Sequence, residues 1–75
     1  MDDAVARAAL SVGESLALAL VECGMVHKQE IIGALEDAAE AHRAAASDGQ
    51  DPEVNTFAAA VIERMIRSLV AAKDN

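Results

Sequence analysis

The sequence lacks most of what common functional classes require. Its 75 residues include one cysteine, one proline, one aromatic residue, and six Lys and Arg against thirteen Asp and Glu. A single cysteine, Cys23, excludes an internal disulfide, and no Cys/His set has the spacing of a structural zinc site. A net charge of −7 opposes binding to nucleic-acid phosphates or anionic lipid surfaces. We therefore expect no metal, no cofactor and no nucleic-acid partner.

Long hydrophobic runs are also missing. The longest uninterrupted apolar run, residues 16–21, has six residues, whereas about 20 are needed to span a bilayer. The chain begins Met-Asp-Asp, without the positive charge that opens a secretory signal. A lone thiol is typical of a reducing compartment. The expectation is a bacterial-type cytoplasmic protein that does not contact membranes.

What the sequence does have is alanine. Apolar residues make up 53% of the chain, but 18 of them are alanine, so the side chains available for a core are few and small. Domains of this size rarely stabilise themselves without a disulfide, a metal or association with another chain. Because the first two are excluded, the composition predicts self-association.

No strand pattern is visible, and the residues with high helix propensity (Ala, Leu, Glu, Arg and Met) dominate. Gly24 suits the left-handed position that ends a helix, with Met25 completing a Schellman motif. Asp51 and Pro52 form a helix start, as N-cap and first helical residue. The sequence thus predicts one all-α domain over 1–75, an antiparallel three-helix bundle with helices at about 3–22, 28–46 and 52–72.

The second and third helices each have one apolar face, whereas the first has two apolar stripes. One stripe contains Val5, Val12, Leu16, Leu20 and Cys23, and we expect Cys23 to be buried there as a small hydrophobe. The other contains Leu10, Ala17, Leu18 and Val21. Since two helices of its own chain cannot surround the first helix, we expect the second stripe to pack against another copy. The predicted assembly is a homodimer forming a six-helix bundle, with a homotetramer as the alternative.

Candidate chemistry is sparse. His42 lies on the apolar face of the second helix. It could serve as a ligand or as a pH-sensitive interface group, and the alternative is a core histidine whose ring nitrogens are satisfied by hydrogen bonds. Residues 13–16, Gly-Glu-Ser-Leu, resemble the Asp-Ser-Leu prosthetic-group motif of acyl carrier proteins. Glutamate replaces the aspartate, however, and the serine lies within the first helix, so no prosthetic group is expected. No base and orienting group are recognisably spaced beside a nucleophile, so we expect no enzyme.

The sequence therefore favours a non-enzymatic, self-associating protein-interaction or regulatory module. A basic protein partner would suit the acidic face formed by Glu36, Asp37 and Glu40. The alternative is a bundle that binds a small apolar ligand between its helices, in a pocket lined by Met25, His42, Phe57 and Met65.

Overall fold

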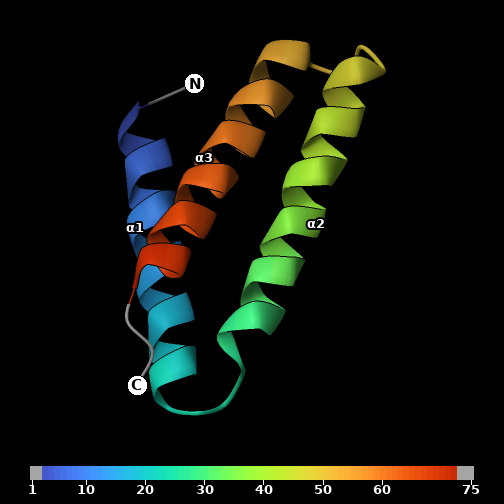
Figure 1. Ribbon diagram of the computed structural model, residues 1–75. Coiled ribbons are helices and arrows are strands. Elements are labelled where there is room, and N and C mark those ends of the chain that lie inside the picture. Colours follow the sequence, from blue (N-terminus) through green and yellow to red (C-terminus); the bar gives the residue numbers. More distant parts are fainter. Residues whose placement is uncertain (1–2, 73–75) are drawn as a thin grey trace.

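Residues 3–72 fold into three helices of equal length. A computed structural model describes residues 3–72 and places α1 at Asp3–Glu22, α2 at Lys28–Ser47 and α3 at Pro52–Ala71 (Figure 1). The described residues contain no strand, which confirms the all-α class. The end of α1 and the starts of α2 and α3 agree with the sequence, α1 is helical from the first described residue, and the ends of α2 and α3 differ from the sequence prediction by one residue.

The end of α1 is the predicted Schellman motif. Gly24 has a φ of 73°, which glycine adopts without a Cβ penalty. The Met25 N–H donates to the Leu20 carbonyl at 3.1 Å, and the Gly24 N–H donates to the Val21 carbonyl at 3.0 Å. These two bonds satisfy the last carbonyls of α1 and turn the chain toward α2.

The turn between α2 and α3 differs in one detail from the expectation. Gly49 has a φ of 82°, and the Gln50 N–H donates to the Ala45 carbonyl at 3.0 Å. Asp51 precedes α3 as predicted, but its φ of 37° and ψ of 61° are left-handed, and its side chain makes no capping hydrogen bond. An N-cap side chain reaches the first turn from extended backbone, so this conformation prevents the expected cap. Asn55 instead donates from Nδ2 to the Gln50 carbonyl at 2.6 Å.

Helix α3 packs against both other helices, whereas α1 and α2 have little contact with each other (Figure 1). The three helices meet where α1 ends, α2 begins and α3 ends. Lys28 Nζ donates to the Ala72 carbonyl at this end of the bundle. The core there consists of Ala17, Ile32 and Leu69, surrounded by Leu18, Ile31, Leu35 and Ile66.

Small residues allow the helices to approach closely. Between α2 and α3, Ala39 and Ala59 are only 1% and 3% exposed. Between α1 and α3, Gly13 lies beneath Met65, and a Cβ on Gly13 would come within 2.6 Å of Met65 Cε. Alanine and glycine thus determine how near the helices lie, which is why an alanine-rich sequence can form this bundle.

The structure reverses the predicted roles of the two stripes of α1. Ala17 is 7% exposed within the core, Leu18 packs against that core, and Leu10 and Val21 are half-buried. These four residues therefore face their own chain. The other stripe faces outward, with Leu16 61% exposed and Cys23 also exposed. The physical reason is shape: Gly13 and Ala17 are small residues, so α3 can approach closely the side of α1 that carries Ala17.

Candidate functional site

The histidine singled out in the sequence ties α2 to α3. The Gln50 carbonyl can only accept a hydrogen bond, so the Asn55 amide turns its Nδ2 toward that carbonyl. The Oδ1 of Asn55 therefore points to His42. His42 Nδ1 therefore carries the hydrogen and donates to Asn55 Oδ1 at 2.8 Å. His42 thus has a satisfied nitrogen in a structural hydrogen bond.

The acidic face predicted for a basic partner is only partly available. Glu36, Asp37 and Glu40 are all exposed on α2. Glu40 accepts from Arg43 at 3.1 Å, and Arg43 also pairs with Glu63 of α3 at 2.7 Å. The hydrogen bond with Glu40 raises the pKa of the Arg43 guanidinium, and both carboxylates contribute further by their charge. The face therefore holds part of an ion-pair network that connects α2 to α3.

The four residues expected to line an apolar pocket do not come together. Met25 is 74% exposed in the turn after α1. His42 lies toward the opposite end of α2 and is bonded to Asn55, while Met65 covers Gly13. Phe57 alone lines the larger groove described next. The sequence placed His42, Phe57 and Met65 on apolar helix faces but could not show which faces enclose a common space.

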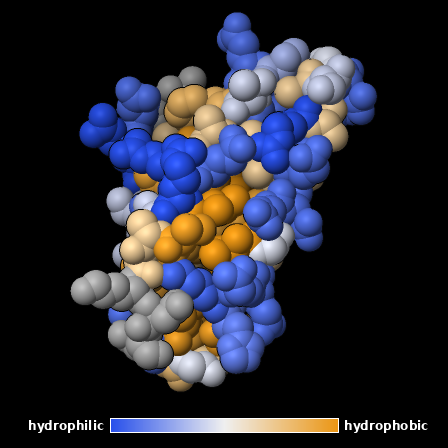
Figure 2. Space-filling model, viewed as in Figure 1, coloured by the Kyte–Doolittle hydropathy of each residue, from blue (hydrophilic) through white to orange (hydrophobic). Residues whose placement is uncertain are grey.

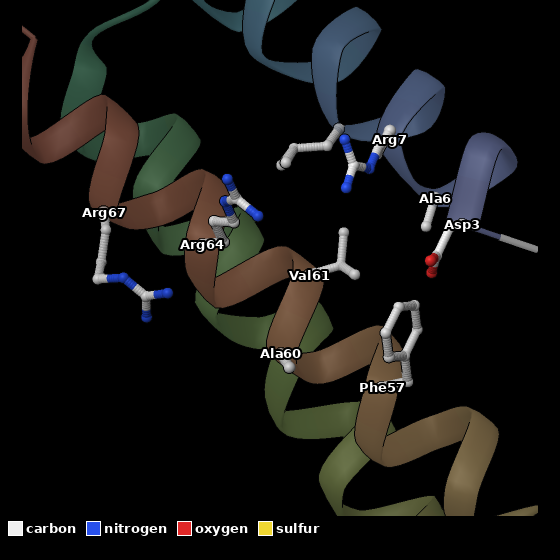
Figure 3. A pocket seen from close by; sticks show the side chains of 9 residues that line it. Asp3, Ala6, Arg7, Phe57, Ala60, Val61, Arg64 and Arg67 are labelled. Atoms are coloured by element: carbon white, nitrogen blue, oxygen red, sulfur yellow. The ribbon is translucent and has the colours of Figure 1, made fainter. Parts of the chain in front are cut away.

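A groove of about 370 Å³ separates the first half of α1 from α3 (Figure 3). The two helices converge at the core and spread apart toward the start of α1 (Figure 1). Apolar side chains line the walls of the groove: Ala6, Leu10, Phe57, Ala60 and Val61. The charged lining residues are Asp3, Arg7, Arg64 and Arg67. This groove is therefore apolar inside and predominantly basic at its rim, in a chain that is otherwise acidic.

A second groove, of about 240 Å³, lies between α2 and α3 and has a different electrostatic character. Its charged lining residues are Glu36, Glu63, Arg43 and Arg67, so its formal charges cancel. In the view of Figure 2, a strip of apolar surface lies between α2 and α3, with hydrophilic side chains on both sides. Only the first groove therefore carries an excess of one charge.

The outward side of α1 carries four exposed large apolar side chains: Val5, Val12, Leu16 and Leu20. Every residue on it is apolar and exposed, and we call it the outer face of α1: Val5, Ala8, Ala9, Val12, Leu16, Ala19, Leu20 and Cys23. By length and composition α1 would be able to cross a membrane, a test that core helices and signal sequences also pass. Uninterrupted apolar runs do not reveal this property, because Arg7 and Glu14 interrupt the apolar residues of α1.

Within residues 3–72, no group of three His, Cys, Asp or Glu side chains is placed to hold a metal ion. Comparison with models of protein families, with curated proteins and with solved structures finds no match to this chain. The functional argument therefore depends on two surfaces on opposite sides of α1, its outer face and the basic groove that it forms with α3.

Proposed function

We propose that this protein is a self-associating interaction module whose copies pair through the outer face of α1, with the two α1 helices antiparallel. The observation that carries the proposal is the spacing of apolar residues on that face. Positions 5, 9, 12, 16, 19 and 23 are all apolar and exposed, and they follow the four-three alternation of a coiled-coil seam along the whole helix. A seam of this kind is a surface that a second helix fills.

The order of side-chain sizes along the seam favours a second copy as that helix. Read from either end, the seam has alanine at its second position and a larger apolar residue at its first and third: Val5, Ala9, Val12, Leu16, Ala19 and Cys23. An antiparallel pair with its two-fold axis near residue 14 would oppose Val12 to the partner's Leu16, and Ala9 to the partner's Ala19. A two-fold interface requires a surface to complement itself, and this order of sizes meets that requirement.

The charges on α1 are compatible with such a pair. Arg7 and Glu14 lie on the side of the helix away from the seam, and Glu22 is the one charged residue that flanks it. Interface centres are depleted of charged residues, as this face is. Antiparallel packing also opposes the two helix dipoles, which parallel packing would align.

A lipid bilayer is the competing environment for an apolar helix face, and the same charges argue against it. Glu14 lies near the middle of α1, and a charged side chain at the centre of a membrane span costs about 2.5–3.5 kcal/mol. Arg7 would add a second charge to the span. Pairing between copies buries only the apolar side of α1 and leaves both charges outside the interface.

The size of the face is suitable for assembly. Helix α1 has 20 residues, so its apolar strip is about 30 Å long and on the order of 300 Å² in area. This is as large as the largest apolar patch of many monomeric proteins. Val5, Val12 and Leu16 are 61%, 59% and 61% exposed, and burying each contributes roughly 1–2 kcal/mol. Six such side chains across two copies contribute roughly 6–12 kcal/mol, from which the lost translational and rotational freedom of two copies, at least about 4 kcal/mol, is subtracted.

The first experiment is the solution mass measured by sedimentation at several micromolar concentrations. We expect twice the 7.8 kDa chain mass for the wild type, and the single-chain mass for Leu16→Glu. The matched control is Val70→Glu, because Val70 is equally exposed, at 62%, but belongs to α3. Wild type that sediments as one chain, or that partitions into lipid vesicles as one chain, would overturn the proposal, and so would Leu16→Glu at the dimer mass.

The orientation of the pair is tested with Cys23. Antiparallel helices place Cys23 near the partner's Val5 and far from its own symmetry mate, beyond the 4.4–6.8 Å between Cα atoms that a disulfide allows. We therefore expect mild oxidation to cross-link Val5→Cys dimers and to leave the wild type without cross-links. Efficient cross-linking of the wild type through Cys23 would indicate a parallel pair.

A further inference from the structure

We propose that the groove between α1 and α3 binds an amphipathic organic anion, a carboxylate carried on a flexible aliphatic chain. This inference concerns the side of α1 opposite the outer face and does not depend on self-association. It is based on the shape of the groove, its apolar walls and its excess of unpaired positive charge.

The groove is formed where α1 and α3 separate. Near the core, Gly13 allows α1 to lie close to Met65 of α3. Toward the start of α1 the helices spread, and the opening is lined by Leu10 of α1 and by Phe57 and Val61 of α3. Phe57 is 38% exposed and so remains accessible from the groove. The opening therefore has the apolar lining and the size, about 370 Å³, that small organic ligands require.

The positive charge at the rim is unpaired. Arg7 from α1 and Arg64 from α3 extend their guanidinium groups into the space between the helices, while Arg67 points away from it (Figure 3). Among residues 3–72, ion pairs involve Arg43 and leave these three arginines without a carboxylate within 4.0 Å. Asp3 also lines the groove, so the two arginines that extend into it exceed its carboxylate by one formal charge.

This combination selects the chemistry of the ligand. Arginine binds carboxylates with two parallel hydrogen bonds, and Arg7 and Arg64 approach the same space from facing helices. An aliphatic chain attached to the carboxylate would cover Leu10, Phe57 and Val61, which are partly open to solvent. A neutral hydrocarbon would leave the arginines unused, and an inorganic anion would leave the apolar walls exposed.

The second groove provides an internal comparison. It also lies between two helices, but Glu36 and Glu63 balance Arg43 and Arg67 there. Arg43 is already held by Glu40 and Glu63. An anion would therefore meet two carboxylates in that groove, and one carboxylate, Asp3, in the groove that we propose.

The test is titration of the isotope-labelled full chain with decanoate, below its micelle concentration, followed by backbone amide resonances. We expect saturable shifts in the first half of α1 and in α3 near Phe57. Arg7→Gln and Arg64→Gln should each weaken binding about tenfold, the effect of losing one charge-assisted hydrogen bond. The matched control is Arg43→Gln, which removes the same charge outside the groove and should bind decanoate as the wild type does.

Decanol, which has the same chain without the carboxylate, separates the two parts of the proposal. It should bind at least tenfold more weakly than decanoate. Equal binding of decanol, unchanged binding by Arg7→Gln and Arg64→Gln, or shifts confined to the outer face of α1 would each overturn the proposal. Both arginines are exposed, so their variants should remain folded, and circular dichroism checks this directly. Leu16→Glu should bind decanoate normally, so failure of the dimer proposal would not affect this result.

Discussion

Replacing Leu69 by alanine should remove a large part of the stability of this bundle. Leu69 is 1% exposed, and it belongs to the core in which α1, α2 and α3 meet. Leucine-to-alanine changes at such sites cost about 2–5 kcal/mol, through lost burial and the cavity that remains. A 75-residue chain has a total stability of roughly 4–11 kcal/mol, so about half of it would be lost. For a domain of this size, we therefore expect Tm to fall by at least about ten degrees.

The neighbouring residue supplies the control for this experiment. Val70 is 62% exposed, so Val70→Ala should change the free energy of unfolding by less than about 0.5 kcal/mol. Both variants are measured by urea unfolding at one protein concentration, because association would itself add to apparent stability. Equal losses for Leu69→Ala and Val70→Ala would refute the reasoning, since they would show that this core does not hold the helices together.

Other predictions follow from particular contacts. A Cβ added at Gly33 would meet no atom of a neighbouring element within 4 Å, so Gly33→Ala should raise the free energy of unfolding by about 0.5–1 kcal/mol. Gly13→Ala should raise the free energy of unfolding by less than Gly33→Ala does, or lower it, because the new methyl group meets the Met65 side chain of α3. Urea unfolding compares the two variants, and an equal increase in the free energy of unfolding would contradict the close contact between Gly13 and Met65. Asn55→Ala should cost about 1 kcal/mol by removing its bonds to His42 and to the preceding turn, whereas Thr56→Ala, at an exposed neighbour, should cost less; equal unfolding midpoints would refute a structural role for the pair. For a dimer, Tm should also rise with protein concentration, and a constant Tm over a hundredfold range would argue against association.

The self-association proposal also changes how the small core is understood. Ala17, Ile32 and Leu69 form the buried cluster, and alanines provide much of the remaining contact. A bundle with so little large apolar volume inside, and a complete apolar seam outside, is typical of a chain that gains stability by assembling. The sequence predicted self-association through the stripe that contains Leu18. From the structure, we propose the outer face of α1 instead.

Much of the fold could be predicted because its signals are local. Gly24 ends α1 through its left-handed backbone, and Pro52 begins α3 with a preset φ, so neither depends on distant residues. The Asp51 cap could not be predicted as reliably, because its backbone conformation depends on the whole turn and on the Asn55 amide. The groove was missed for a similar reason: Arg7 and Arg64 are 57 positions apart in the sequence and become neighbours only through packing.

The sequence by itself determined three amphipathic helices and most of their ends, and its small apolar side chains predicted self-association. Periodicity could not decide which side of α1 faces the bundle, because both of its stripes are apolar and about equally suited to burial. Tertiary structure decided it through shape, since Gly13 and Ala17 let α3 approach one side closely. The same packing turned Leu16 and Cys23 outward, and the divergence of α1 from α3 opened the basic groove.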